Sequence, residues 1–213
     1  ILLDNAKVVL HLIPLSLSQS VKQLEISKVP LLFHQNDVAN LHSQRFNLDG
    51  VVFYRSRQQQ DPAGEYIQIF RDGSFEYLDA ELCSPWSNGG EKIRDLPAVD
   101  FEREIMNTVL RALHFQKVLS VEPPMYVFLS LVGVKGLRMG TDARTMSAYH
   151  NSGFDRHLVL LPELRVETYI SDPDEVTQLL RPVFDATWNS AGWPYSIHYD
   201  ENGKWNPGRT RYR

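Results

Sequence analysis

The sequence of 213 residues has one cysteine, no long apolar run and no excess of positive charge. The lone Cys83 has no partner for a disulfide within the chain, so cross-links cannot stabilise the fold. The apolar runs reach about ten residues, far short of the roughly 20 needed to cross a bilayer. The 22 Lys and Arg against 26 Asp and Glu leave a net charge of -4. These features disfavour a membrane partner and strong non-specific binding to nucleic acids.

The start of the chain and its composition bear on domain organisation. The sequence begins at Ile1 without an initiator Met and enters a strand-like run over residues 8–14, which is typical of a piece of a longer protein. No signal-peptide pattern is visible, so we expect a reducing cytoplasm. Apolar residues make up 43% of the chain, enough for a sizeable core. We predict one accessory domain over residues 1–213, with a terminal hairpin and basic tail over residues 195–213.

Strands are predicted where β-branched and aromatic residues follow turn residues. Residues 51–54 follow an Asp-Gly pair, and the nearly all-apolar residues 125–132 predict a central strand that is buried on both faces. The clearest element is a hairpin over residues 66–79. There Asp72-Gly73 predicts a two-residue type I′ turn that places Phe70 opposite Phe75, with aromatics on one face and aliphatics on the other. Residues 158–169 predict one or two strands, interrupted at Pro162.

Helical spacing of apolar residues predicts two main helices. One follows Asp100, a predicted N-cap, and ends before residues 122–124. The other follows Asp172 as its N-cap and ends at Gly192, with a kink or break at Pro182. Residues 16–45 predict a connection with one short helix. Together these elements predict an α+β fold with an antiparallel or mixed β-sheet and two main helices packed on it.

Several of these segments together resemble the C-terminal region of bacterial multidomain proteins that carry an N-terminal Schlafen-like, AlbA-type DNA-binding or ATP-binding domain. The matching stretches are residues 8–14, 46–54, 66–80, 122–136, 158–163 and 181–192. They consist mainly of core and turn residues, and no residue here inherits the activity of the N-terminal domain. The resemblance implies an accessory module in transcription regulation or defence. Its implied partner is that N-terminal domain, and a homo-oligomer is the other protein partner considered.

Candidate ligand residues gather after the apolar strand of residues 125–132. The seven histidines show no His-x-x-x-His spacing, so we predict no metal and no cofactor, and for His11 a satisfied hydrogen bond in a strand. His150 and His157 flank a polar loop and are the one pair worth testing as ligands or acid/base groups. The glycines around Lys135 favour a tight turn over a phosphate cradle. The candidate ligand or loop residues are Lys135, Arg138, Arg144, His150 and His157, and we predict no catalytic residue.

The end of the chain combines positive charge with aromatic rings that are able to stack on bases. The nucleic-acid candidates are Lys204, Trp205, Arg209, Arg211, Tyr212 and Arg213. A solvated tail explains this composition equally well. Acidic residues at positions 49, 79, 81, 100 and 102 are able in principle to gather a divalent ion, but turn, strand-surface and helix-cap roles account for each of them.

Three functional hypotheses follow. The leading one is a non-catalytic regulatory or interaction module that responds to a ligand or partner through residues 133–157 and the terminal hairpin. The alternatives are a nucleic-acid-binding or nucleic-acid-processing domain, and a small-molecule sensor with a pocket under the aromatic face of the hairpin. A flat apolar patch favours the first, an acid-lined basic groove the second, and a closed apolar cavity the third.

Overall fold

The main element of the fold is one sheet of eight strands. The computed structural model of the chain describes residues 6–15, 24–55, 64–84, 86–88, 91–93, 95–141 and 153–208. The strand order is β11-β9-β1-β5-β4-β3-β2, with β12 also paired to β9, and every neighbouring pair is antiparallel. The strands are β1 (Lys7–Pro14), β2 (Ser43–Phe46), β3 (Gly50–Tyr54), β4 (Glu65–Phe70), β5 (Phe75–Asp79), β9 (Met125–Val132), β11 (Leu158–Leu160) and β12 (Leu164–Val166).

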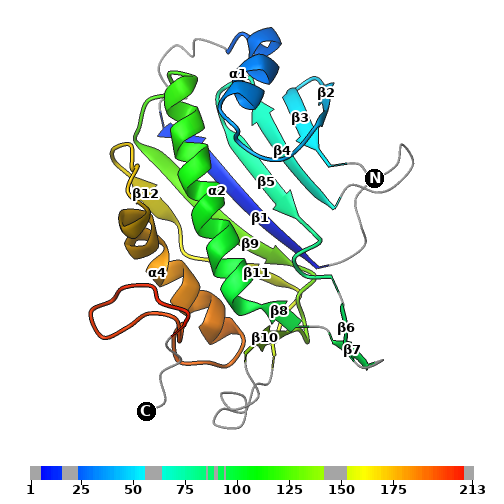
Figure 1. Ribbon diagram of the computed structural model, residues 1–213, viewed down its shortest axis with the longest axis vertical. Coiled ribbons are helices and arrows are strands. Elements are labelled where there is room, and N and C mark those ends of the chain that lie inside the picture. Colours follow the sequence, from blue (N-terminus) through cyan, green and yellow to red (C-terminus); the bar gives the residue numbers. More distant parts are fainter. Residues whose placement is uncertain are drawn as a thin grey trace.

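The described helices lie on one face of this sheet. They are the short 3-10 helix η2 (Ile26–Lys28), α1 (Val29–Gln35), α2 (Ala98–Val118) and α4 (Pro173–Ser190). Phe33 of α1 stacks on Phe53 of β3 and meets Phe115 of α2 edge-on, which places α1 and α2 on the same side. Figure 1 shows α2 crossing in front of the sheet with α4 beside it. The predicted α+β fold with two main helices on a sheet is confirmed.

The sheet has two different faces because successive side chains of a strand point to opposite sides. In β1, Val8, Leu10 and Leu12 face the helices and are at most 1% exposed, whereas the residues between them are half-buried. β9 alternates in the same way, so the prediction that it is buried on both faces is wrong. It is also not the central strand, since only β11 and β12 lie beyond it. The far side of β9 carries no described helix, and this explains the difference.

The hairpin of β4 and β5 forms with a register that differs from the prediction by one residue. The backbone N–H of Phe70 donates to the carbonyl of Ser74 (2.9 Å), so the loop has three residues. Its third residue, Gly73, has φ +87°, and Asp72 does not share this conformation, which is the pattern of a type I turn with a bulge. Phe75 therefore pairs with Ile69, and aromatic and aliphatic side chains share the helix-covered face.

The helix ends confirm some predictions and correct others. The N-cap of α4 is Asp172, whose carboxylate accepts the N–H of Asp174 (2.9 Å), as predicted. Pro182 lies inside one continuous helix, so the predicted break is absent. α2 begins at Ala98, three residues earlier than an N-cap at Asp100 predicts, and Asp100 lies in its first turn. Where a terminal hairpin was predicted, the Asp200 N–H donates to the Lys204 carbonyl (2.8 Å) and an isolated antiparallel bridge joins Tyr199 to Trp205, so a turn forms without paired strands. Residues 209–213 of the predicted hairpin and tail lie outside the described residues.

Short elements complete the fold around one end of α2. β6 (Trp86–Asn88) pairs with β7 (Glu91–Ile93), and β8 (Asp95–Pro97) pairs in parallel with β10 (Arg138–Gly140). The parallel pair ties the chain after β9 to the start of α2. In the part of the chain that the structure describes, no helix has the length and apolar character of a transmembrane span.

Candidate functional site

Three of the predicted ligand residues lie near the end of β9: Lys135 in the turn that follows it, Arg138 at the start of β10, and His157, whose carbonyl accepts the N–H of Gly133 (2.6 Å). The Leu137 N–H donates to the carbonyl of Val134 (2.9 Å) and Gly136 has φ +81°, which confirms the predicted tight turn. Lys135 and His157 are exposed. Arg138 is held by Asp95, with 3.0 Å between Nε and Oδ1. The turn therefore brings Lys135 and the His157 backbone to one edge of the sheet, while the Arg138 guanidinium is used in an ion pair. Arg144 and His150 lie outside the described residues.

Two predicted nucleic-acid residues are tied to the helices. The Lys204 ammonium pairs with Asp174 at 3.1 Å on the surface. The Trp205 indole is partly buried, packs against the core and donates its N–H to Glu102 (2.7 Å). The remaining candidates, Arg209, Arg211, Tyr212 and Arg213, lie outside the described residues.

Glu102 is the centre of a buried polar cluster between α2, α4 and residues 196–205, called here the C-terminal segment. Its side chain is fully buried and accepts four hydrogen bonds. The donors are Trp188 Nε1 (2.8 Å) and Ser196 Oγ (2.7 Å) at Oε1, with His198 Nδ1 (2.7 Å) and Trp205 Nε1 (2.7 Å) at Oε2. Ser196 bonds to the carboxylate and not to the imidazole, which differs from a Ser–His–acid relay. We assign this cluster the role of fastening the C-terminal segment to α2.

The face of the sheet opposite the helices, called here the open face, is the larger candidate surface. It is defined by side chains of five neighbouring strands: Leu158 and Leu160 of β11, Tyr126, Phe128, Ser130 and Val132 of β9, Lys7, Val9, His11 and Ile13 of β1, Glu76 and the buried Leu78 of β5, and Tyr66, the buried Gln68 and Phe70 of β4. Most are half-buried, and at one side Leu160 is 72% exposed and Leu158 50%. Large apolar side chains thus form a continuous surface that no described helix covers.

A polar group lies within this apolar surface. Glu76 Oε2 lies 2.7 Å from His11 Nε2, and Glu76 Oε1 accepts the hydroxyl of Tyr66 (2.6 Å). The hydrogen bond from His11 is the main reason why the pKa of Glu76 is held below its ordinary value, against the opposing effect of burial. The predicted role of His11, a strand histidine with a satisfied hydrogen bond, is confirmed. His11 of β1 and Tyr66 of β4 both reach Glu76 because their strands lie on either side of β5 and all three side chains point to the open face.

The size of the open face can be compared with that of protein interfaces. Its strands β11, β9, β1, β5 and β4 have 3, 8, 8, 5 and 6 residues, which at about 3.3 Å per residue and roughly 4.8 Å between strands gives about 480 Å² in projection. A specific interface buries about 800 Å² on each partner. The open face thus offers more than half of this area in projection, and the relief of its side chains adds to it.

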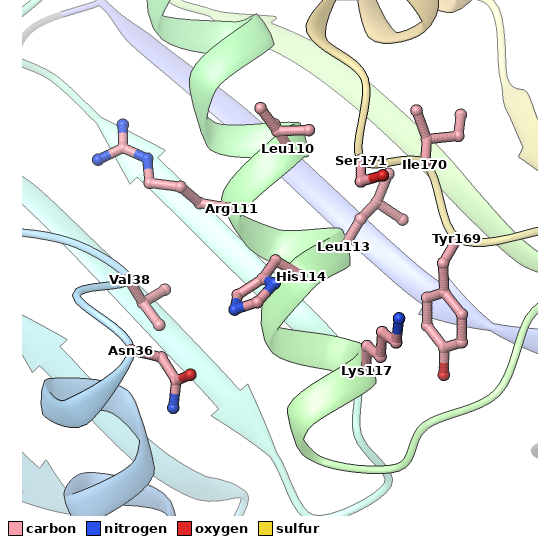
Figure 2. A pocket seen from close by; sticks show the side chains of 10 residues that line it. All are labelled: Asn36, Val38, Leu110, Arg111, Leu113, His114, Lys117, Tyr169, Ile170 and Ser171. Carbon is pink, nitrogen blue, oxygen red and sulfur yellow. The ribbon is translucent and has the colours of Figure 1, made fainter.

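A second candidate surface is a hollow of about 360 Å³ that lies over the C-terminal half of α2. Figure 2 shows its lining, in which α2 separates residues of the α1–β2 connection from residues of the β12–α4 connection. The lining residues are Asn36, Val38, Leu110, Arg111, Leu113, His114, Lys117, Tyr169, Ile170 and Ser171. This hollow is not the pocket predicted under the hairpin, where core side chains fill the helix-covered face.

Positive charge is concentrated in the hollow. Arg111, His114 and Lys117 recur every three residues and lie on one side of α2. Arg111 is paired with Glu104, with 3.1 Å between Nη2 and Oε1. Within the described ranges, neither His114 nor Lys117 has an acidic partner within ion-pair distance. The Lys117 ammonium lies instead 5.8 Å from the centre of the Tyr169 ring.

Comparisons with models of known protein families, with curated proteins and with solved structures give no match to this chain. The open face and the hollow are therefore the features of this chain that bear on its function.

Proposed function

We propose that this chain is a non-catalytic interaction module of a cytoplasmic, bacterial regulatory or defence protein, and that its open face packs against a Schlafen-like, AlbA-type domain of the same polypeptide. The open face carries this proposal. It presents aromatic and aliphatic side chains over five strands, and burial of apolar area is the main source of free energy in protein association.

The composition of the open face favours a folded protein as the occupant. Its half-buried Tyr126 and Phe128 are aromatic side chains, which are enriched at the centres of interfaces, and the half-buried Ile13 adds apolar area beside them. The pair of His11 and Glu76, joined by Tyr66, already satisfies much of its own hydrogen bonding. A nucleic-acid backbone requires instead a surface rich in Lys and Arg. The choice of a Schlafen-like domain as occupant rests on the sequence resemblance alone.

A matched pair of leucine substitutions tests the proposal in the complete polypeptide. Leu160 on the open face and Leu31 on α1 are both strongly exposed, at 72% and 62%. We expect Leu160→Asp to separate the domains, because a carboxylate in an apolar interface pays a desolvation cost without a partner. Small-angle scattering then shows an increased radius of gyration, whereas Leu31→Asp leaves it unchanged.

Two results would contradict the proposal. One is an unchanged radius of gyration for the Leu160→Asp polypeptide. The other is a dimer of the isolated chain that Leu160→Asp dissociates, since the occupant of the open face would then be a second copy. The regulatory role is tested by deleting residues 1–213 from the complete polypeptide and comparing its assembly and nucleic-acid binding. Unchanged assembly and binding after the deletion would refute that role.

A further inference from the structure

The hollow over α2 combines an apolar floor with cationic groups at its rim. Leu113 and Val38 are buried beneath it, at 0% and 2% exposure, and Leu110 and Ile170 are half-buried beside them. His114 and Lys117 are exposed above this floor. Figure 2 shows the His114 ring pointing toward Asn36 and the Lys117 chain rising beside Tyr169. A ligand that lies across α2 therefore meets apolar surface and positive charge together.

The ring of Tyr169 is held in a fixed position. Its hydroxyl donates to the carbonyl of Val121 (2.7 Å), and its ring lies beside the Lys117 ammonium. A ring that is already positioned loses little conformational entropy when a flat molecule packs on it. Burial, with a smaller effect of the negative charge of Glu122, raises the pKa of Tyr169. The nearby Glu122 disfavours a negative group at the Tyr169 end, so a ligand anion is better placed between His114 and Lys117.

The helix dipole accounts for only some of the basic residues of α2 that line the hollow. Lys117 lies in the last turn of α2, where a positive charge interacts favourably with the helix dipole. Arg111 and His114 lie further from the helix end, and this effect falls off within the last turn. Arg111 is already balanced by Glu104. Among the described residues, Lys117 thus leaves a positive charge without an acidic partner above an apolar floor, and the imidazole of His114 lies on the same side of α2.

We propose that this hollow binds a small organic anion, a phosphate or carboxylate carried on a planar apolar body. The anionic group lies between His114 and Lys117, and the planar body packs on Leu110, Leu113 and Tyr169. Asn36 and Ser171 stand at opposite sides of the hollow and supply neutral hydrogen-bonding groups. The volume of about 360 Å³ lies within the usual range of roughly 300–1,000 Å³ for small-molecule sites. This inference does not depend on the open face.

The test is a titration of the chain with phenyl phosphate and benzoate, followed by NMR and calorimetry. We expect saturable binding of at least one probe, with the largest shifts at Leu113 and Tyr169. Inorganic phosphate and phenol, which each carry half of the proposed chemistry, should bind about tenfold more weakly or worse. If neither aromatic anion saturates the chain at concentrations up to about 10 mM, its affinity is weaker than millimolar and the proposal is overturned.

Substitutions locate the site. Lys117→Gln should weaken binding of the responding probe by about three- to tenfold because it removes a charge-assisted contact, and His114→Gln should weaken it as well because it removes the imidazole that borders the anion. Arg103 is the control on the same helix, since it is 50% exposed and pairs with Asp100 away from the hollow. Arg103→Gln should leave the affinity unchanged. Equal losses in all three variants, with unchanged melting temperatures, would show a diffuse charge effect and overturn the assignment.

Discussion

The substitution Glu102→Gln tests how the C-terminal segment is attached to the core. Each carboxylate oxygen of Glu102 accepts one indole N–H, from Trp188 at Oε1 and from Trp205 at Oε2. An indole nitrogen can only donate a hydrogen bond, and the amide nitrogen of glutamine also only donates. In either orientation of the new amide, one indole N–H therefore faces another donor.

The cost follows from that conflict. A buried donor left without an acceptor costs about 1–3 kcal/mol, and the charge-assisted bonds at the other atoms are weakened as well. Removing one partner from a buried charged network typically costs about 3–5 kcal/mol, and we expect a loss in that range. Asp100→Asn is the control on the same helix, because the Asp100 side chain is 63% exposed and should cost less than about 1 kcal/mol.

Urea unfolding followed by tryptophan fluorescence measures both variants. Trp205→Phe is a milder companion that removes one donor and leaves the carboxylate in place, and it should cost about 1–2 kcal/mol. The reasoning is refuted if Glu102→Gln lowers the unfolding free energy by less than about 1 kcal/mol, or by no more than Asp100→Asn.

Two further predictions concern the core of the sheet and one of its turns. Gly73 and Gly136 have φ +87° and +81°, but a Cβ at Gly73 would lie 2.7 Å from Val121 Cγ2, and one at Gly136 would meet nothing within 4 Å. Gly73→Ala should therefore lower the unfolding free energy by about 2–3 kcal/mol and Gly136→Ala by about 1 kcal/mol, and equal losses in thermal unfolding would contradict this. Burial raises the pKa of Glu65 from 4.5 to about 7, so its protonated form is favoured in the folded state. Stability should fall by up to about 3 kcal/mol as pH rises from 4.5 through 7, and Glu65→Gln should remove this slope in urea titrations at pH 5 and pH 8.

The fold class was predictable because its local patterns are strong. Runs of β-branched, aromatic and other apolar residues next to turn residues located most of the main strands, helical spacing located both long helices, and Asp172 with Pro173 marked the start of α4 correctly. The hairpin register was not predictable from Asp72-Gly73, because this pair suits both a two-residue loop and the three-residue loop that forms. The start of α2 was missed since the N-cap position is Pro97, which offers no side-chain acceptor.

The candidate surfaces depend on tertiary structure and were largely hidden in the sequence. The open face exists because all described helices pack on the same side, and alternation within a single strand does not reveal this. The spacing of Arg111, His114 and Lys117 is visible in the sequence, but at the end of a helix it also suits the helix dipole. The role of Glu102 had one visible sign, an acidic residue beside the apolar stripe of α2, but the predicted N-cap at Asp100 placed Glu102 in the first helical turn, where a cap role accounts for an acidic residue.

Thiol labelling of the open face in the complete polypeptide is the most direct test of the proposed function. The native Cys83 is 3% exposed and burial raises its pKa to about 12, so it reacts slowly and gives a low background. Ser130→Cys places a thiol on the open face, and Asn107→Cys places a control on the exposed side of α2. We predict that Ser130→Cys labels at least about tenfold more slowly in the complete polypeptide than in the isolated chain, a protection worth about 1.4 kcal/mol, while Asn107→Cys is unchanged. Equal labelling rates for Ser130→Cys in the two proteins would contradict the account.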